Sequence, residues 1–252
     1  RNGDFRSGYY RDQTFMMAAG LFTAKEFFAQ LYGQTDIELN PGNAGRTFNN
    51  HFATRSLNPD GTWKDLTKQK NSTPDISPTA GQMPRLLGLA WASKLFRNNK
   101  ELWRFEQFSR KGNEVAFGTI GDASTSEGHF WETLNAAAVL QVPMVVAVWD
   151  DGYGISVPRD YQTAKGNISE LVKGFEKGES DVNGIYIYRV KGWDYPALIE
   201  TFTQGVERSR TEQVPVLFHV TEITQPQGHS TSGSHERYKS PERLQWEKDY
   251  DC

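Results

Sequence analysis

Two short motifs place acidic residues directly after apolar segments. Asp122 follows an apolar stretch that ends at Gly121, and Asp151 opens the Asp-Gly-Tyr-Gly sequence that comes after another such stretch. An amphipathic segment separates them, so both carboxylates are expected at the carboxyl ends of neighbouring parallel strands, where open α/β sheets bind ligands. Magnesium prefers hard oxygen ligands and commonly takes only one or two carboxylates. The sequence therefore predicts a divalent-metal site at Asp122 and Asp151.

Neighbouring residues would complete this site. Glycines on either side of Tyr153 let the backbone approach closely, which makes the Tyr153 carbonyl a third candidate metal ligand. Ser124 and Glu127 have the Ser-x-x-Glu spacing of a capping box, which predicts a helix start that favours an anion beside the metal. Each motif alone is commonly only a turn, because Asp-Gly is a frequent turn dipeptide. The combination favours a phosphate-bearing cofactor.

The segments around these motifs alternate between strand and helix patterns. Strands are expected over 114–120, 144–149, 185–190 and 214–222, and helices over 126–140, 168–175 and 196–210. Upstream, the sequence predicts helices over 23–32 and 83–97, with a long functional loop over 36–70; a mobile loop is expected over 224–240. This order predicts an α/β fold, a mainly parallel twisted sheet with helices on both faces, in a single domain over 1–252.

Composition excludes several partners. A formal net charge of −3 gives no basic field, so neither nucleic acid nor an anionic membrane surface is expected. The longest apolar run, from Val142 to Trp149, is far below the roughly 20 residues of a membrane span. A single cysteine, Cys252, excludes an internal disulfide and favours the cytoplasm, or the mitochondrial matrix in a eukaryote. The chain begins without Met, which is compatible with a segment of a longer polypeptide.

The two motifs together resemble a known cofactor-binding pattern. Gly121-Asp122-Ala123 followed by Asp151-Gly152-Tyr153-Gly154-Ile155-Ser156 is similar to the thiamine diphosphate motif, which opens with Gly-Asp/Glu-Gly and closes with Asn-Asn. The residues between them narrow the resemblance to the alpha subunit of the decarboxylating component of 2-oxo acid dehydrogenase complexes, most like the branched-chain 2-oxoisovalerate enzymes. Further matching segments are Gly8–Asp12, Gly45-Arg46, His51, Ser77–Pro84 and Gly228–Ser232.

The resemblance implies a thiamine diphosphate-binding fold and roles for the matched positions. Asp122, Asp151 and the Tyr153 carbonyl would hold Mg²⁺ on the diphosphate. The cofactor itself would contact Tyr10, Arg11, Ser77, Thr79, Gln82, Gly121, Asp122, Ala123, Ser124, Asp151, Tyr153, Ile155 and His229. The segment from Ser77 to Gln82 matches one that lines the aminopyrimidine end and, in some relatives, a K⁺ site. His229 and His51 match catalytic or site-lining histidines, and Ser230 matches a position that is phosphorylated in mammalian relatives.

The sequence departs from the family pattern at several positions. Ala123 replaces the usual glycine, and Asp150-Asp151 replaces the Asn-Asn pair, which predicts extra negative charge near the diphosphate. Trp149 and Gln225 stand where relatives have arginines, so Arg11 is expected to carry the phosphate charge nearly alone. We expect these changes to raise metal affinity more readily than cofactor affinity.

The other histidines have plainer interpretations. His219 lies inside an apolar strand pattern and is expected to be a hydrogen-bonded core or edge residue, and the same is expected of His129. The spacing of His229 and His235 does not match a zinc site. Because the ordinary pKa of histidine lies near neutral pH, His229 is a better candidate for proton transfer than for zinc binding.

The function implied is thiamine diphosphate-dependent oxidative decarboxylation of a 2-oxo acid, with acyl transfer to a lipoyl domain, as in branched-chain amino acid degradation. The family's beta subunit, or a fused beta domain, would supply the missing half of the site in a two-alpha two-beta assembly. Pyruvate and acetoin remain alternative substrates. Two rival functions remain as well: a catalytically inactive thiamine diphosphate-binding subunit, and a magnesium phosphohydrolase with Asp122 as nucleophile or ligand.

Overall fold

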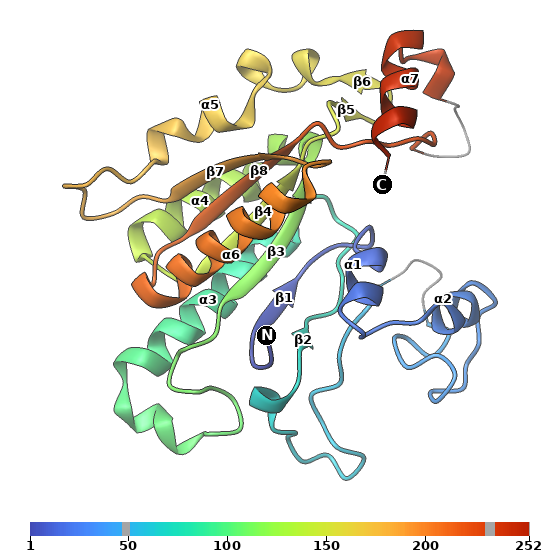
Figure 1. Cartoon of the computed structure of the whole chain (residues 1–252). Coiled ribbons are helices and arrows are strands. Elements are labelled where there is room, and N and C mark those ends of the chain that lie inside the picture. Colours follow the sequence, from blue (N-terminus) through green and yellow to red (C-terminus); the bar gives the residue numbers. More distant parts are fainter. Residues whose placement is uncertain (47–50, 230–234, 252) are drawn as a thin grey trace.

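A computed structural model describes residues 1–46, 51–229 and 235–251. Six parallel strands form the main sheet in the order β2-β1-β3-β4-β8-β7 (Figure 1). The strands are β1 (Phe5–Ser7), β2 (Asn71–Ser72), β3 (Ala116–Gly121), β4 (Met144–Trp149), β7 (Tyr186–Lys191) and β8 (Val216–Thr221). The predicted α/β fold with a parallel sheet is confirmed. Across the described residues, no helix is both long and apolar enough to cross a membrane.

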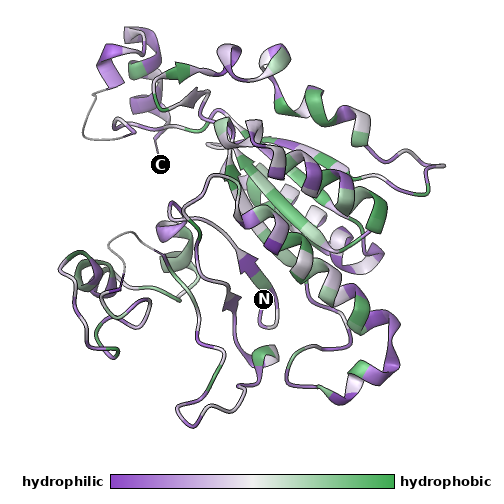
Figure 2. Cartoon of the chain, turned by 180° about the vertical axis from the view of Figure 1, so that it is seen from behind, coloured by the Kyte–Doolittle hydropathy of each residue, from purple (hydrophilic) through white to green (hydrophobic). Residues whose placement is uncertain are grey.

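Helices cover both faces of the sheet, as predicted. One face packs against α3 (Gln82–Asn98), α4 (Gly128–Leu140) and α5 (Ile168–Val172) around a core that includes Leu86, Leu134 and Val146. The other face packs against α6 (Tyr195–Glu212), through Phe202 and its neighbours. Apolar residues concentrate in the central strands, whereas β2 and much of β1 are polar (Figure 2).

Local signals explain where the helices begin. At α2 (Ala24–Leu31), Thr23 and Glu26 form a complete capping box, which fixes the predicted helix. The capping box expected at Ser124 and Glu127 is wrong. Ser124 lies inside a 3-10 turn over Ala123–Ser126, and α4 starts only at Gly128 without a side-chain cap. The chain makes a tight turn directly after Asp122 before it enters α4, so the residues of the supposed box belong to that turn.

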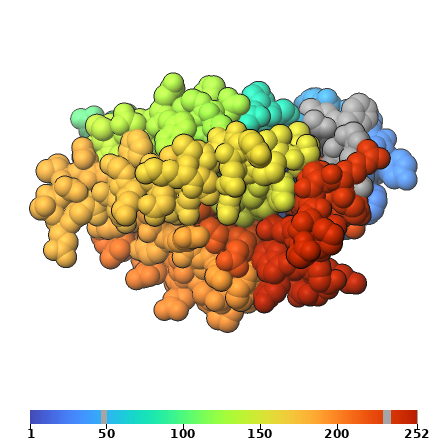
Figure 3. All heavy atoms as spheres, turned by 90° about the horizontal axis from the view of Figure 1, so that it is seen from above, coloured from blue at the N-terminus to red at the C-terminus, as the bar shows by residue number. Residues whose placement is uncertain are grey.

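Several elements were not predicted. They are β1, β2, the short helix α1 (Gln13–Ala18), the hairpin of β5 (Tyr153–Gly154) with β6 (Val157–Pro158), and the C-terminal helix α7 (Pro241–Tyr250). The hairpin segment and the C-terminal segment that carries α7 meet on one face of the molecule (Figure 3). There the rings of Tyr153 and of Tyr238, just before α7, lie 5.6 Å apart between centroids at an angle of 54°. At the end of the expected loop over 224–240, the Ser240 side chain accepts a hydrogen bond from the Arg243 amide and so caps α7.

Candidate cofactor and metal site

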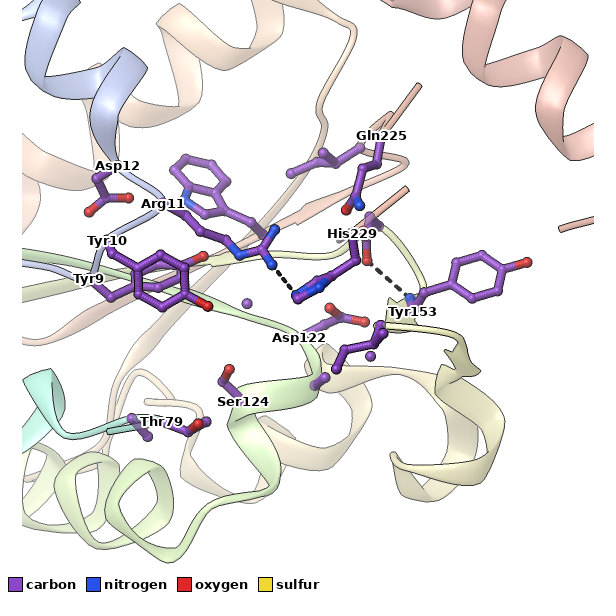
Figure 4. A pocket seen from close by; sticks show the side chains of 18 of the residues that line it. Tyr9, Tyr10, Arg11, Asp12, Thr79, Asp122, Ser124, Tyr153, Gln225 and His229 are labelled. Atoms are coloured by element: carbon purple, nitrogen blue, oxygen red, sulfur yellow. Dashed lines mark hydrogen bonds between the residues drawn. The ribbon is translucent and has the colours of Figure 1, made fainter. Parts of the chain in front are cut away.

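A cavity of about 840 Å³ opens at the carboxyl ends of β3 and β4. Its lining includes nearly all the predicted site residues: Tyr10, Arg11, Ser77, Thr79, Gln82, Gly121, Asp122, Ala123, Ser124, Asp151, Tyr153, Ile155 and His229. They come from segments far apart in the sequence, which the parallel sheet brings to one edge (Figure 4). His51 is the exception. It does not line the cavity, although its Nε2 is hydrogen-bonded to Oγ of Ser77, which does.

Strand pairing fixes the two acidic residues next to each other. Gly121 pairs with Trp149 at the ends of β3 and β4, and the Asp122 amide donates to the Trp149 carbonyl at 3.0 Å. Asp122 is only 4% exposed, and its Oδ2 has no hydrogen-bond partner among the described residues. The Asp151 carboxylate accepts from the Tyr153 amide through Oδ1 at 3.0 Å. Among the described residues, the buried Oδ2 of Asp122 therefore has no donor, and this bond engages one of the two oxygens of Asp151.

The electrostatics of this pair call for a cation. Burial, followed by the negative charges of Asp151 and Asp150, raises the pKa of Asp122 to about 8. Burial also raises the pKa of Asp151, against the opposing effects of the Tyr153 amide and of Lys239 and Arg243. A divalent ion would relieve both costs.

The donor set fits Mg²⁺. Within the described residues, no group of three or more His, Cys, Asp or Glu side chains could hold a metal. Two carboxylates with a backbone carbonyl suit an ion that takes its remaining ligands from phosphate and water.

The turn after Asp151 presents backbone to the cavity. Gly152 has φ 83°, and its carbonyl accepts from the Arg159 amide at 2.9 Å, which closes the β5–β6 hairpin. Ile155 has φ 61°, an unfavourable region for a β-branched residue, and is 57% exposed. A strained, exposed apolar side chain at a cavity edge is typical of a ligand contact.

Arg11 and His229 point toward each other across the cavity (Figure 4). The Arg11 guanidinium is hydrogen-bonded to Nε2 of His229. Burial, and then the charge of Arg11, lowers the pKa of His229, while its Nδ1 is buried without a partner among the described residues. Because a guanidinium only donates, Nε2 of the neutral ring accepts this bond and Nδ1 carries the proton, which it can donate to an anionic ligand.

Gln82 anchors the opposite wall. Its amide nitrogen donates to the Thr119 carbonyl at 2.8 Å, and its buried Oε1 has no partner within the described part of the chain. Ser77 and Thr79 line the cavity just before α3. This wall therefore offers hydroxyls and an amide oxygen, which suit a polar heterocycle.

The sequence departures have a structural context. Asp150 does not line the cavity, because its carboxylate turns toward Nε2 of His219 at 2.8 Å and Arg159 at 3.3 Å. Burial alone would raise the pKa of Asp150, but the bond and charge of His219 and the charge of Arg159 bring it below its usual value. Trp149 lines the cavity while stacking on Phe202 at an interplanar angle of 19°.

Sequence reasoning missed the basic residues of the C-terminal segment. Arg243 donates to the Asp151 carbonyl at 2.8 Å, and Lys239 donates to the Gln225 carbonyl at 3.1 Å. Both lower the pKa of Asp151. Neither side chain lines the cavity, where Arg11 is the only Arg or Lys among the described residues, so the expectation that Arg11 carries the phosphate charge nearly alone stays a prediction. The missed signal was Ser240-Pro241, an N-cap followed by proline at the first helical position.

Of the predictions for His219 and His129, one is confirmed and one is wrong. His219 is 1% exposed and hydrogen-bonded, so its assignment as a satisfied core residue is confirmed. His129 is exposed on the first turn of α4, so the expectation of a core or edge residue there is wrong. Ser230, the matched phosphorylation position, lies outside the described residues.

Sequence comparisons relate the chain to known proteins. The chain is 28% identical over 214 residues to 2-oxoisovalerate dehydrogenase subunit alpha of Bacillus subtilis (strain 168), covering 81% of this chain and 56% of that protein. It is 28% identical over 243 residues to the mitochondrial subunit alpha of Caenorhabditis elegans (96% and 47%), and 30% identical over 241 residues to subunit alpha 1 of Arabidopsis thaliana (95% and 42%). The chain thus spans about half the length of these curated relatives. The model of the family described as Dehydrogenase E1 component matches residues 1–252, and the chain belongs to that family.

Proposed function

We propose that this chain forms the alpha part of a 2-oxo acid dehydrogenase decarboxylating component that binds thiamine diphosphate and Mg²⁺. One observation carries the proposal: the buried Oδ2 of Asp122 has no donor among the described residues, next to a second carboxylate at the end of a large cavity. Such a pair is stabilised by a divalent ion bound to an anionic ligand.

Each wall of the cavity has a task in this proposal. Asp122, Asp151 and the Tyr153 carbonyl would hold the metal, and Arg11 with Tyr10 would hold the diphosphate. Ser77, Thr79 and Gln82 would receive the aminopyrimidine end, and a K⁺ ion near this segment is part of the proposal. When bound, thiamine diphosphate supplies the electron sink for loss of carbon dioxide.

His229 would hold or move a proton at the reacting end of the cavity. Its lowered pKa favours the neutral ring, whose Nδ1 has no partner among the described residues. His51 would act through Ser77, with which it shares a hydrogen bond. In the branched-chain type that we favour, the substrate is a 2-oxoisovalerate-like acid and the acyl acceptor is a lipoyl domain. A beta subunit or fused beta domain would complete the site.

Thermal unfolding tests the proposal directly. With Mg²⁺ and thiamine diphosphate at about 100 times Kd, we expect the free energy of unfolding to rise by about 2.7 kcal/mol, because the ligands bind only the native state. Asp122→Ala should abolish the rise, whereas Asp60→Ala, in an exposed turn, should retain it. No rise in the wild-type chain, with or without a beta partner, would sink the proposal.

Turnover assays then separate the alternatives. With a beta partner, faster reaction of branched 2-oxo acids than of pyruvate or acetoin supports the favoured substrate. Cofactor binding without any turnover would support the inactive-subunit alternative, to which the replacement of the Asn-Asn pair by Asp150-Asp151 points. Phosphate release from a phosphomonoester without thiamine diphosphate would support a phosphohydrolase.

A further inference from the structure

Three polar side chains form a continuous hydrogen-bonded chain beneath the metal-binding turn. Ser169 Oγ on α5 lies 2.6 Å from Nδ1 of His219, and His219 Nε2 on β8 lies 2.8 Å from Oδ2 of Asp150. His219 and Asp150 are 1% and 2% exposed. The chain thus links a helix, a central strand and the end of β4 through the interior of the protein.

The hydrogen-bonding roles follow from the acceptors. The ionised Asp150 can only accept a hydrogen bond, so Nε2 of His219 must donate one. In a neutral ring, Nδ1 then accepts a hydrogen bond from the Ser169 hydroxyl. The order Ser-His-Asp is that of a nucleophilic triad, but none of the three side chains lines the cofactor cavity. An arrangement that is buried and fully bonded is suited to fixing geometry.

Asp150 is also hydrogen-bonded to both sides of the turn that contains Asp151 and Tyr153. Its amide donates to the Val220 carbonyl at 2.9 Å, and its carbonyl accepts from the Ile223 amide at 3.2 Å. Its Oδ1 accepts from the Gly152 amide at 2.9 Å, so the side chain holds the turn on the far side of Asp151. The neighbouring Asp151 is held between these fixed points, with Tyr153 one residue beyond the turn.

We propose that Ser169, His219 and Asp150 are positioning residues that set the metal-binding turn, so that divalent-metal affinity depends on a histidine buried in β8. The inference rests on the proposed function, because it takes Asp151 and the Tyr153 carbonyl as metal ligands. It also explains why a polar residue lies within an apolar strand, between the buried Phe218 and Val220.

The test is Mg²⁺ affinity, measured by calorimetry on the full chain in the presence of thiamine diphosphate and any beta partner that binding requires. His219→Leu removes both bonds at similar volume and should weaken Mg²⁺ binding at least tenfold. His219→Gln, whose amide can still donate to Asp150, should restore most of the affinity. Leu217→Val is the matched control, because it alters the same face of the same buried strand without touching Asp150. It should lower stability and leave Mg²⁺ affinity within twofold.

Ser169→Ala decides the matter if His219→Leu does not fold. Ser169 is only half-buried, and its loss should weaken Mg²⁺ binding about threefold by freeing the His219 ring. Unchanged Mg²⁺ affinity in the folded variants would overturn the inference while leaving the proposed function intact. Absence of Mg²⁺ binding in the wild-type chain would instead overturn the proposed function. A loss of affinity equal in Leu217→Val and His219→Leu would mean that the histidine acts only through stability.

Discussion

At the level of single residues, the site stores an electrostatic cost that its ligand would relieve. Asp122 is buried beside the half-buried Asp151, and each carboxyl has a pKa raised above the usual value. Unpaired buried charge destabilises a fold, so a pair of carboxylates of this kind is typical of a functional site whose ligand compensates the cost. The metal-free chain should therefore show the cost as a dependence of stability on pH.

The sign of that dependence is fixed by Asp122. Its pKa is about 8 in the folded chain and 3.8 in the unfolded reference, so the native state keeps a proton that the unfolded state releases. The metal-free free energy of unfolding should fall as pH rises from about 4 to about 8, by up to about 1.4 kcal/mol per pH unit. Denaturant titration across this range should show the slope flatten in Asp122→Asn and persist in the exposed-site control Glu200→Gln. An unchanged slope in Asp122→Asn would show that other groups dominate.

Arg11 gives a second prediction at this scale. If its guanidinium leaves His229 to bond with a diphosphate, Arg11→Gln should weaken thiamine diphosphate binding tenfold to a hundredfold, about 1.5–3 kcal/mol for a bond to a charged group. Trp149 lines the cavity, so quenching of its fluorescence offers a binding signal. Arg85→Gln is the control, because Arg85 bonds to the Pro74 carbonyl and does not line the cavity. Equal affinities in the two variants would remove Arg11 from the site.

At the level of elements, the predictable parts were those with regular apolar patterns. The central strand β4 is buried on both faces and appears in the sequence as an unbroken apolar run, which made its bounds readable. The polar strand β1 could not be read in this way. Its Arg6 is buried only because Asp12 and Asp75 pair with it at 2.6 and 2.7 Å, and long-range ion pairs leave no local pattern.

The site residues were predictable for the same reason. Asp122 and Asp151 follow readable strands, so their positions at one edge of the sheet could be inferred. The bend of Asp150 toward His219 and the return of α7 to the Asp151 turn depend on contacts between distant segments. Sequence spacing carries no information on those contacts.

The helix α7 carries the prediction at this scale. Lys239 and Glu247 form an ion pair in which both side chains are 1% exposed, and Arg243 joins Glu247 at 2.8 Å. Removing one partner leaves the other as an unpaired buried charge, so Glu247→Ala should destabilise the chain by about 3–5 kcal/mol. Replacing both partners, Lys239→Met with Glu247→Leu, should recover most of this loss.

Amide hydrogen exchange would show which elements are destabilised in Glu247→Ala. In Glu247→Ala, faster exchange should begin in α7 and at the Tyr153 turn that it contacts, before the central strands are affected. Glu242→Ala is the control, because Glu242 is an exposed residue in the first turn of the same helix. An equal increase in exchange in all elements would mean that α7 does not unfold separately from the rest of the protein.

At the level of the whole molecule, one helix face has no partner among the described residues. Phe28 and Leu31 on α2 and Tyr32 at its C-cap are 57%, 48% and 87% exposed, and their spacing puts them on one side of the helix. Ile37, on the following segment, is 50% exposed as well. Exposed apolar residues grouped in this way are typical of a surface that another protein covers.

This face gives the last prediction, in which the proposed beta partner packs against α2. Replacing Leu31 and Tyr32 with glutamate should weaken association at least tenfold, because two charges would be buried in an apolar contact. Analytical ultracentrifugation of the mixed chains measures the change. Val182→Glu is the matched control, being 91% exposed in the loop before β7 and far from α2 in sequence. If the α2 variant still binds its partner like the control, this face is not the contact between the two chains.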